Sequence, residues 1–429
     1  MKIAVIGEGI AGLSAALMAQ AKGHQVTIFT KGMGGLGISN GTGDVLGYVG
    51  EEAVSGSPFS ALEKVPQEHP YRAIGVANVQ AGMEWLREAL PDFFLAPAEG
   101  NAWLPTAIGA LRPTYLVPRS CEHAIAKNGA AFLVVGLKQY KDFPAELIAD
   151  NLSRAEQFSI TARAVKLDFT VRPGEPDVNG TDYARALDTQ ELDPTRAAQL
   201  RSKLADLINK EVREGETVLI PAIMGLNADA FADFAAKVQA PVAEVPTVPP
   251  SILGRRIFDL LVNKCREKRI DIRLNSAARG AVTAGSRVER LEIRRAGGSD
   301  MVRVDGVIDA AGGFASGNIT RNSHLEMAEA IFDLPLFTPD PGEISGLHEI
   351  DVENRRYVAA VLMAGVKVNE QMLPIGDGGK PEYSNVYCVG DLLGGAAPWR
   401  ELCGEGIALG SAYAAVNALD TQERGAHNA

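Results

Sequence analysis

Apolar and polar residues alternate in short blocks at the start of the chain. Residues 3–6 form an apolar run, residues 13–21 have the small and apolar composition of a buried helix, and residues 26–29 form a second apolar run. Gly7, Gly9 and Gly12 stand around the start of the predicted helix. This order predicts a strand, a glycine turn, a helix and a second parallel strand, the unit that holds a phosphate group at a helix N-terminus.

The three glycines have distinct expected tasks. We expect Gly7, Gly9 and Gly12 to allow a tight turn, a close approach of the backbone to the phosphate, and close packing of the helix on the strand. Thr30 and Lys31 follow the second apolar run, where an acidic residue usually holds an adenosine ribose. The pattern therefore predicts a phosphate-bearing cofactor beside Thr30 and Lys31, with one of the usual contacts missing. The alternative is a unit of the same shape with an empty turn.

A glycine-rich segment follows at residues 32–44. Its composition does not suit a packed helix or strand, and it is typical of backbone that lies against a flat ligand. On this interpretation Ser39, Asn40 and Gly41 contact the cofactor. The alternative is a flexible surface loop.

The C-terminal third adds residues that suit a flavin. A predicted strand over residues 386–391 ends in Gly390 and Asp391, and a predicted helix opens with Gly404, Gly406 and Ile407. Asp391 would accept a hydrogen bond from a ribityl hydroxyl, and the N-terminus of the helix would direct its partial positive charge at the flavin pyrimidine ring. Gly312 lies in a small-residue turn that would let the backbone pass close to the same cofactor. Taken alone, Asp391 is typical of a helix or turn cap.

Between these ends the periodicity predicts a separate region. Helices are expected over residues 73–90, 143–152, 195–213 and 252–268, and strands over 131–137, 159–169, 217–222, 270–274, 287–294 and 301–309. We predict a discontinuous Rossmann-like α/β fold of the FAD/NAD(P)-binding type with an inserted α/β domain. Its predicted parts are a flavin-binding domain in two pieces, 1–95 and 249–429, an inserted substrate or cap domain at 96–248, and a short return of the cap near 336–365.

Composition excludes several classes of function. The net charge is −11 and there is no run of Lys and Arg, which argues against nucleic-acid binding. The four cysteines are far apart and form no CxxC pair, so we expect neither an iron–sulfur cluster nor a metal site in this chain. No apolar stretch is long enough to span a bilayer, and Met1 is followed almost at once by the first strand. We expect a cytoplasmic protein whose membrane contact, if any, is made through a partner subunit.

Several of these stretches resemble a known family. Residues 364–370 and 385–391 are similar to the C-terminal cofactor signature of flavoproteins of the fumarate reductase/succinate dehydrogenase type. Residues 39–46, 218–229, 248–254 and 392–406 more closely resemble the family of B-type subunits of anaerobic glycerol-3-phosphate dehydrogenase. The resemblance implies a flavin-dependent subunit in glycerol catabolism and anaerobic respiration, working beside a larger flavoprotein catalytic subunit and a membrane-anchored iron–sulfur subunit. That assembly oxidises sn-glycerol 3-phosphate to dihydroxyacetone phosphate and passes the electrons to quinone. The resemblance implies FMN, which needs no ribose carboxylate at Thr30, with FAD as the alternative.

The sequence leaves the catalytic residues open. Dehydrogenation needs a base for the hydroxyl proton, for which His69, His123 and His348 are candidates, although a histidine without a catalytic role is the commoner case. Arg255, Arg256 and Arg400 are candidates for the substrate phosphate because guanidinium groups bind phosphate in a bidentate manner. Two other functions remain: a free-standing flavin oxidoreductase for another small hydroxy acid or alcohol, and a cofactor-free assembly subunit. Within the family reading, the chain is either the site of substrate oxidation or an electron relay.

Overall fold

The computed structural model describes residues 1–95, 99–190, 192–340, 358–376 and 378–427, with the side chains of residues 423–427 left aside. The chain divides into two compact units. The first consists of Met1–Gly35, Asp44–Ala89 and Leu260–Ala429, and the second of Leu36–Gly43 and Leu90–Asp259. The chain thus crosses between the units several times, and each unit is built from segments that are far apart in sequence.

The first unit is organised around a five-stranded sheet in the order β11-β2-β1-β15-β20. Every neighbouring pair in this sheet is parallel, with Ile6 of β1 opposite Phe29 of β2 and Asp309 of β15. The strands are β1 (Lys2–Ile6), β2 (Gln25–Phe29), β11 (Asp271–Arg273), β15 (Gly306–Asp309) and β20 (Val386–Cys388). Parallel strands that are covered on both faces are continuously apolar, which explains the runs seen at residues 3–6 and 26–29.

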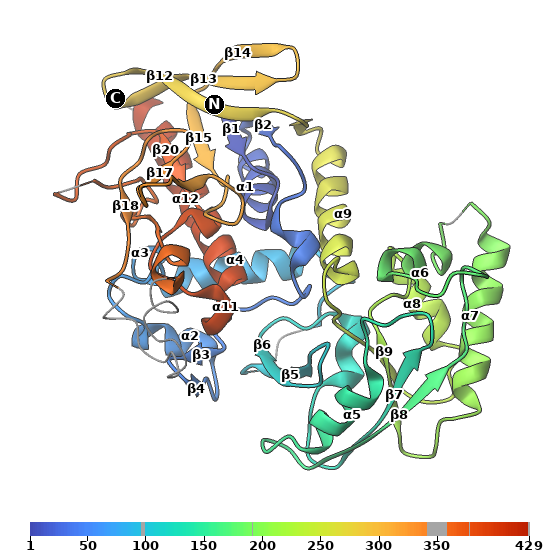
Figure 1. The fold of residues 1–429 in the computed structure, drawn as a ribbon. Helices are drawn as coiled ribbons and strands as arrows, with labels where there is room; N and C mark the ends of the chain where they lie inside the picture. Colours follow the sequence, from blue (N-terminus) through green and yellow to red (C-terminus); the bar gives the residue numbers. More distant parts are fainter. Residues whose placement is uncertain (96–98, 191, 341–357, 377, 428–429) are drawn as a thin grey trace. The chain divides into compact units, whose positions relative to one another are not determined.

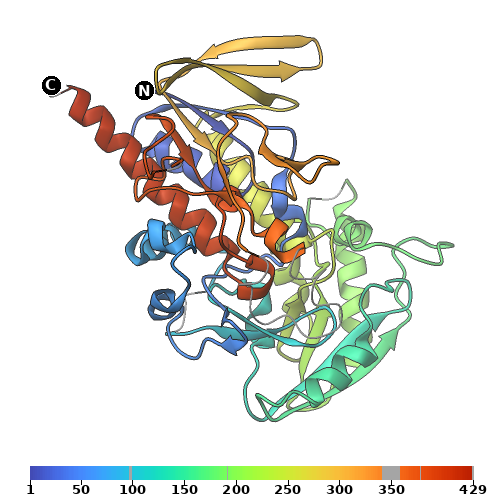
Figure 2. The ribbon, with the colours of Figure 1, turned by 60° about the vertical axis from the view of Figure 1, so that its left-hand side comes forward.

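Long helices cover this sheet. The first, α1 (Ile10–Ala21), is buried along most of its length, so its residues are small and apolar rather than amphipathic. Alongside it runs α12 (Gly404–His427), which also contacts α4 (Val76–Ala89) and is visible over its whole length in Figure 2. The remaining elements of this unit are β3 (Tyr48–Val49), β4 (Glu52–Ala53), α2 (Pro58–Ala61), α3 (Tyr71–Ile74), β12 (Ala277–Ala284), β13 (Arg287–Arg295), β14 (Gly298–Arg303), β16 (Ile319–Arg321), β17 (Met327–Glu329), β18 (Leu336–Phe337), β19 (Gly365–Val366) and α11 (Pro398–Glu401).

The strand predicted over residues 301–309 is wrong in one respect, because it is two strands in two sheets. Its first part belongs to β14 in an antiparallel sheet with β12 and β13, seen at the top of Figure 1. Its second part is β15 in the central sheet. The break falls at Asp305, whose carboxylate accepts a hydrogen bond from the backbone N–H of Lys2 at 2.6 Å and whose own N–H donates to the Lys2 carbonyl at 2.8 Å. These two bonds fix the point at which the chain enters the central sheet.

The second unit has its own parallel sheet, in the order β10-β9-β7-β8. Its strands are β7 (Ala130–Leu137), β8 (Ile160–Leu167), β9 (Thr217–Pro221) and β10 (Val242–Val245). The other elements are the hairpin of β5 (Ala102–Pro105) and β6 (Leu111–Thr114), the helices α5 (Ala145–Ser153), α6 (Gly180–Ala186), α7 (Pro194–Asn209) and α8 (Ala228–Ala235), and the first half of α9 (Ile252–Glu267). The strands predicted over 131–137, 159–169 and 217–222 are confirmed, as are the helices over 143–152 and 195–213. The short elements β5, β6, β10, α6 and α8 were not predicted.

The domain bounds expected from sequence remain predictions. The structure places residues 36–43 with residues 90–259, so Ser39, Asn40 and Gly41 belong to the unit of the four-stranded sheet. The expected return of the cap near 336–365 lies partly outside the described residues, which omit 341–357. Among the described helices, all are too short or too polar to cross a bilayer.

Candidate functional site

Of the three glycines in the turn after β1, two are tightly packed and one borders open space. A Cβ on Gly7, whose φ is +105°, would lie 2.2 Å from the Ala310 carbonyl oxygen, and one on Gly12 would lie 2.2 Å from the Gly7 carbonyl oxygen. Both glycines are therefore required by the packing of β1, α1 and the turn after β15. A Cβ on Gly9, in contrast, would have no atom within 4 Å.

The open space at Gly9 lies at the start of α1. Gly9 is the N-cap residue of this helix, and no side chain caps its first turn. The unsatisfied N–H groups and the positive end of the helix dipole make such a turn a site for phosphate. The backbone of Gly34 closes on this turn, since a Cβ there would lie 2.9 Å from the Gly9 Cα. The residues present thus fit the phosphate of a nucleotide or flavin.

The position after β2 explains the missing carboxylate. Thr30 is buried, and its hydroxyl donates to the Gly32 carbonyl at 2.7 Å and accepts from the Gly32 N–H at 3.0 Å. The carboxyl of Glu8 lies beside the Thr30 hydroxyl, and burial raises the pKa of Glu8 although Thr30 and Arg266 act to lower it. Lys31 is exposed. A carboxyl group therefore does lie beside Thr30, but it comes from the glycine turn between Gly7 and Gly9 and not from the residues after β2.

The turns after β15 and β20 meet each other and α1. Gly312 has a φ of +80°, and a Cβ on Gly313 would lie 2.5 Å from the Asp391 carbonyl oxygen. The Gly313 N–H donates to the Asp391 carboxylate at 3.3 Å. Gly390 has a φ of +71°, and a Cβ there would lie 2.9 Å from the Ala11 Cβ. Asp391 itself is exposed, so its side chain is accessible to a ligand.

At the start of α12, as in the turn after β1, one glycine borders open space and another is tightly packed. A Cβ on Gly404 would have only Pro398 Cβ near it, at 3.7 Å, whereas one on Gly406 would lie 2.2 Å from the Tyr71 hydroxyl. The Gly406 N–H donates to the Asp44 carbonyl at 2.8 Å, and the N–H of the buried Ile407 donates to the Cys403 carbonyl at 3.0 Å. Gly406 and Ile407 thus position the helix through contacts within the protein, and Gly404 presents the open end.

The segment with Ser39, Asn40 and Gly41 packs on the start of α9 within the second unit. A Cβ on Gly41, whose φ is +73°, would lie 2.3 Å from the Leu253 Cβ, and the Ser39 hydroxyl donates to the Leu36 carbonyl at 3.2 Å. The Gly41 N–H donates to the Ser39 hydroxyl at 3.3 Å. These glycine and serine positions have a packing reason of their own, and a contact of Ser39, Asn40 and Gly41 with the cofactor stays a prediction.

A family model described as an FAD binding domain matches residues 2–407. The chain belongs to this FAD-binding family. Flavin is accordingly its cofactor class, and the predicted α/β fold of the FAD-binding type is confirmed.

Relatives of this FAD-binding protein share one name. The B-type subunit of anaerobic glycerol-3-phosphate dehydrogenase from Vibrio cholerae serotype O1 is 28% identical over 433 residues, covering 97% of this chain and 96% of the relative. A protein from Halobacterium salinarum, named as the probable B-type subunit of the same dehydrogenase, is 28% identical over 431 residues, covering 96% of each chain.

Solved structures are more distant. A 3-ketosteroid delta1-dehydrogenase from Sterolibacterium denitrificans is 10% identical with a TM-score of 0.45, covering 98% of this chain and 99% of that one. The open conformation of a flavocytochrome c3 fumarate reductase is 12% identical with a TM-score of 0.42, covering 98% of this chain and 78% of that one.

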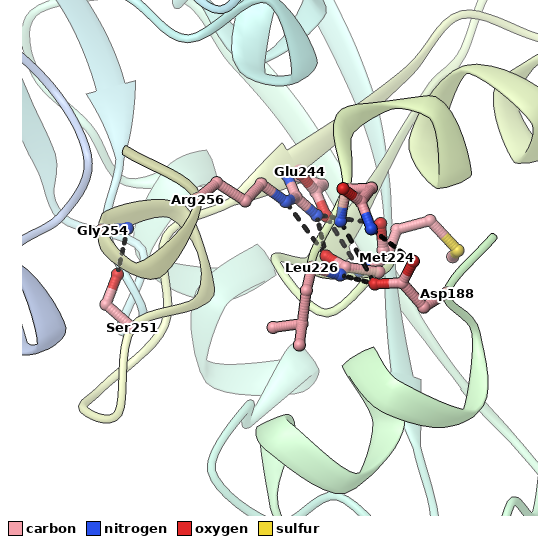
Figure 3. Close-up of polar contacts among 9 residues, drawn as sticks. Asp188, Met224, Leu226, Glu244, Ser251, Gly254 and Arg256 are labelled. Atoms are coloured by element: carbon pink, nitrogen blue, oxygen red, sulfur yellow. Dashed lines mark hydrogen bonds and ion pairs between the residues drawn. The ribbon is translucent and has the colours of Figure 1, made fainter. Parts of the chain in front are cut away.

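Arg256 does not fit the predicted role in phosphate binding. It is only 2% exposed, and its guanidinium pairs with the fully buried Glu244, with Nη1 at 2.6 Å from Oε2 and Nη2 at 3.0 Å from Oε1. The remaining donors bond to the carbonyls of Met224 and Gly225 at 2.8 to 3.0 Å (Figure 3). A buried charge is stable only when it is paired and hydrogen-bonded in this way, so Arg256 is a structural residue of the FAD-binding chain.

The other two arginines stay predictions. Arg255 is 46% exposed and pairs with Asp259 one helical turn further on, at 2.7 Å. Arg400 is half-buried in the short helix α11. Surface ion pairs such as that of Arg255 contribute little, so its guanidinium remains available to an anion.

The three candidate histidines differ in their surroundings. His123 is exposed, and His348 lies outside the described residues. His69 is only 1% exposed, and it lines a cavity of about 620 Å³ together with Arg72, Lys367 and Asn369. Its imidazole lies beside two further ionisable side chains, Glu401 and Cys403, neither of which was singled out as a site residue from the sequence.

Proposed function

We propose that the chain is the flavin-bearing B-type subunit of an anaerobic glycerol-3-phosphate dehydrogenase, which oxidises sn-glycerol 3-phosphate to dihydroxyacetone phosphate with electrons passed on to quinone. The observation that carries the proposal is the end-to-end similarity to relatives of that name, over 97% of this chain and 96% of the relative. The open glycine positions at Gly9 and Gly404 support it, because both leave room for a ligand at a helix start.

A bound flavin supplies the acceptor for a hydride from the carbinol carbon of the substrate. The residues of the chain then have separate tasks. The first turn of α1 at Gly9 binds phosphate, Asp391 accepts a hydrogen bond from a ligand hydroxyl, and the start of α12 at Gly404 directs its positive end toward the reduced flavin. Exposed Arg255 and half-buried Arg400 are the candidates for the phosphate of the substrate, and their contact with it is part of the proposal.

We favour FAD over the FMN that the resemblance implied. The argument for FMN rested on Thr30, where no carboxylate is present to hold an adenosine ribose. The carboxyl of Glu8 lies beside Thr30 and can serve the same ribose, so the absence of an acidic residue after β2 no longer argues against an adenosine half. The family description, an FAD binding domain, points the same way.

Partners and location are also part of the proposal. The relatives are named as one subunit of a dehydrogenase, and we propose that this chain works with a larger flavoprotein catalytic subunit and a membrane-anchored iron–sulfur subunit. The chain would then lie at the cytoplasmic face of the cell membrane through those partners.

The function is tested with the purified chain, alone and co-purified with its partner subunits. We expect a bound flavin in the visible spectrum, FAD on extraction, and bleaching of the flavin band when glycerol 3-phosphate is added without oxygen. Bleaching by another small alcohol or hydroxy acid but not by glycerol 3-phosphate would favour the free-standing dehydrogenase. A colourless protein that still assembles with its partners would favour the cofactor-free subunit. Bleaching that requires the larger subunit would indicate a relay.

The role of Glu8 is tested separately. The variant Glu8→Gln should weaken the binding of FAD to the flavin-free protein by about tenfold, since one charged hydrogen bond to the ribose contributes on the order of 1.5 kcal/mol. Binding of FMN should be unchanged. Glu52→Gln, an exposed position on β4, is the matched control. Equal loss of FMN and FAD affinity in Glu8→Gln would contradict a ribose contact.

A further inference from the structure

His69, Glu401 and Cys403 form a compact cluster in the first unit. The Nε2 of His69 lies 3.4 Å from Oε2 of Glu401, and the thiol of Cys403 donates to the same oxygen at 3.5 Å. The His69 and Cys403 side chains are buried, whereas the Glu401 side chain is 20% exposed. The potential ligand atoms all lie within 4.8 Å of one another, a spacing that a tetrahedral metal ion would also accept.

The hydrogen bond on the other side of the imidazole argues against a metal ion at His69. The Tyr71 backbone N–H donates to Nδ1 of His69 at 3.1 Å, so Nδ1 carries no hydrogen. A neutral imidazole then carries its hydrogen on Nε2, which faces Glu401 and has no lone pair to offer a cation. Among the described residues, the acceptor that this hydrogen faces is Oε2 of Glu401, 3.4 Å from Nε2, and no side chain other than Glu401 competes for it. His69 is therefore a donor to a carboxylate.

Oε2 of Glu401 is held by several donors at once. It accepts the Ala397 backbone N–H at 2.8 Å, in addition to the thiol of Cys403 and the nearby His69. Burial acts to raise the pKa of Glu401, but the donors, His69 first, outweigh it and leave the pKa below its usual value. Burial also holds the pKa of Cys403 well above its usual value, so the thiol keeps its hydrogen. Glu401 is thus an ionised carboxylate with one oxygen fixed in place.

The other oxygen of Glu401 has a different environment. No hydrogen bond from the described part of the chain engages Oε1, and the side chain is partly exposed. Glu401 ends α11, Leu402 turns the chain with a φ of +51°, and Cys403 precedes the open helix start at Gly404. The buried Tyr71 hydroxyl lies between the carbonyls of Val45 and Cys403, 3.1 Å from that of Cys403, which holds this turn in place. A carboxylate oxygen that is ionised, oriented and accessible is suited to accept a hydroxyl hydrogen.

We propose that Glu401 binds the carbinol hydroxyl of the substrate and takes its proton, with His69 and Cys403 as positioning residues. The inference rests on the proposed function. A bound flavin would accept the hydride of the C–H bond. As the O–H bond breaks, its proton goes to Oε1 of Glu401 and its electron pair forms the carbon–oxygen double bond. The resulting carboxylic acid then loses its proton to solvent through its exposed edge. The base is therefore a glutamate, and His69 serves it instead of acting as the base.

The first experiment compares Glu401→Gln with the matched control Glu68→Gln, an exposed carboxylate in the loop before His69. Both variants are prepared in the full chain co-purified with its partner subunits. Glu401→Gln should retain its flavin and lower the rate of flavin bleaching by glycerol 3-phosphate by roughly 100-fold, the lower range for loss of a general base. The affinity for glycerol 3-phosphate, measured by titration in the absence of turnover, should fall by about tenfold because a charged acceptor is lost. Glu68→Gln should match the parent chain in both.

The second experiment tests His69 and Cys403 as positioning residues by measuring how activity depends on pH. Activity requires ionised Glu401 and should fall as the pH is lowered through its depressed pKa. Removing a donor in His69→Ala or Cys403→Ala raises that pKa, so the acid limb should move to higher pH. His69→Gln and Cys403→Ser restore an N–H and an O–H donor, and the limb should move back. A purely structural role would not produce this reversal.

Failure of the inference can be told apart from failure of the function. Bleaching by glycerol 3-phosphate at equal rates in the parent chain and Glu401→Gln would overturn the role of Glu401 and leave the function standing. If the parent complex is not bleached at all, both are overturned. Stoichiometric zinc that disappears in Cys403→Ser would overturn the hydrogen-bonded cluster. An acid limb that stays in place in His69→Ala and Cys403→Ala would overturn the positioning roles.

Discussion

The two parallel sheets of the molecule end in different ways at their carboxyl edges. In the four-stranded sheet, Glu244 of β10 is paired with Arg256, and the chain's own carbonyls take the remaining guanidinium donors (Figure 3). In the five-stranded sheet, β1 ends at the open turn of Gly9, and β15 ends at the buried Asp309, which has no cationic partner among the described residues. Ligands of α/β folds bind at the carboxyl ends of parallel strands. One edge is therefore filled by the protein itself, and the other is left for a ligand.

Near the Arg256–Glu244 pair, the carboxylate of Asp188 takes up further donors at the filled edge. It is buried, and its carboxylate accepts the Asn227 N–H at 3.2 Å and the Asn227 side-chain amide at 2.8 Å. The backbone N–H of Leu226 donates to the same carboxylate. Backbone donors that could have bound an anionic ligand are thus already satisfied, which is why the second unit offers no phosphate turn of this kind at residues 224–227.

The largest loss of stability is expected from removing the Arg256–Glu244 ion pair of the filled edge. Arg256→Met leaves the Glu244 carboxylate buried without its partner, and we expect a loss of about 3–5 kcal/mol in the free energy of unfolding. Urea unfolding followed by circular dichroism measures it. The neighbour Arg255→Met, which breaks an exposed pair, should lose less than about 1 kcal/mol. A loss in Arg256→Met no larger than that control would show that the edge is not held by this pair.

Per pH unit, a smaller effect on stability is expected from Asp309, the buried acid of the open edge that has no cationic partner among the described residues. Burial, with repulsion from Glu329, raises the pKa of Asp309 to about 8, while the Ala311 N–H acts in the opposite direction. The folded protein therefore keeps a proton that the unfolded chain releases near pH 4. Stability should fall as the pH rises from about 4 to about 8, by at most about 1.4 kcal/mol per pH unit, and level off above that.

Asp309→Asn should remove this slope. Unfolding by urea at a series of pH values checks it, with Asp271→Asn, an exposed residue on β11 of the same sheet, as the control. If the dependence of stability on pH persists in Asp309→Asn, another group causes it. Glu329 and Cys388, whose pKa values are also raised by burial, are the candidates.

The smallest change in stability and the most specific change in binding are expected at Gly9. Gly9→Ala adds a methyl group to open space, so the free energy of unfolding should change by less than about 1 kcal/mol. The methyl occupies the place of the phosphate, and flavin affinity should fall by about tenfold or more. Flavin titration of the flavin-free protein measures it. Gly12→Ala, whose Cβ would meet the Gly7 carbonyl, should instead lose about 1–3 kcal/mol of stability. Unchanged flavin binding in Gly9→Ala would place the phosphate elsewhere.

The local pattern was enough to predict most elements that are long or strongly apolar. The strands at 131–137 and 217–222 and the turn at Gly7, Gly9 and Gly12 follow from runs of apolar residues and from glycine spacing, both of which are local properties. The chain-specific chemistry was harder to predict. Arg256 looked available for phosphate because nothing in its neighbourhood in sequence shows that Glu244, on another element, neutralises it in the core.

The cluster around Glu401 shows the same limit. His69 and Glu401 are separated by more than 300 residues, and only the folded chain reveals that Tyr71 takes up Nδ1 and turns His69 into a donor. The break of the strand at 301–309 also depends on a distant residue, since Lys2 fixes Asp305. Pairings over such distances leave no period in the sequence.

The strand order has a consequence for biosynthesis. In the five-stranded sheet, β1 lies between β2 and β15, and the sheet ends with β20 at residues 386–388. The four-stranded sheet has all its strands by residue 245. A ribosome that delivers the N-terminus first therefore supplies a complete second unit long before the first unit can close. The turn at Gly9 emerges before the whole second unit, whereas Gly404, at the start of α12, emerges after it. We therefore expect flavin to bind only after β20 has been synthesised, and a chain truncated before residue 386 should fold its second unit and remain colourless.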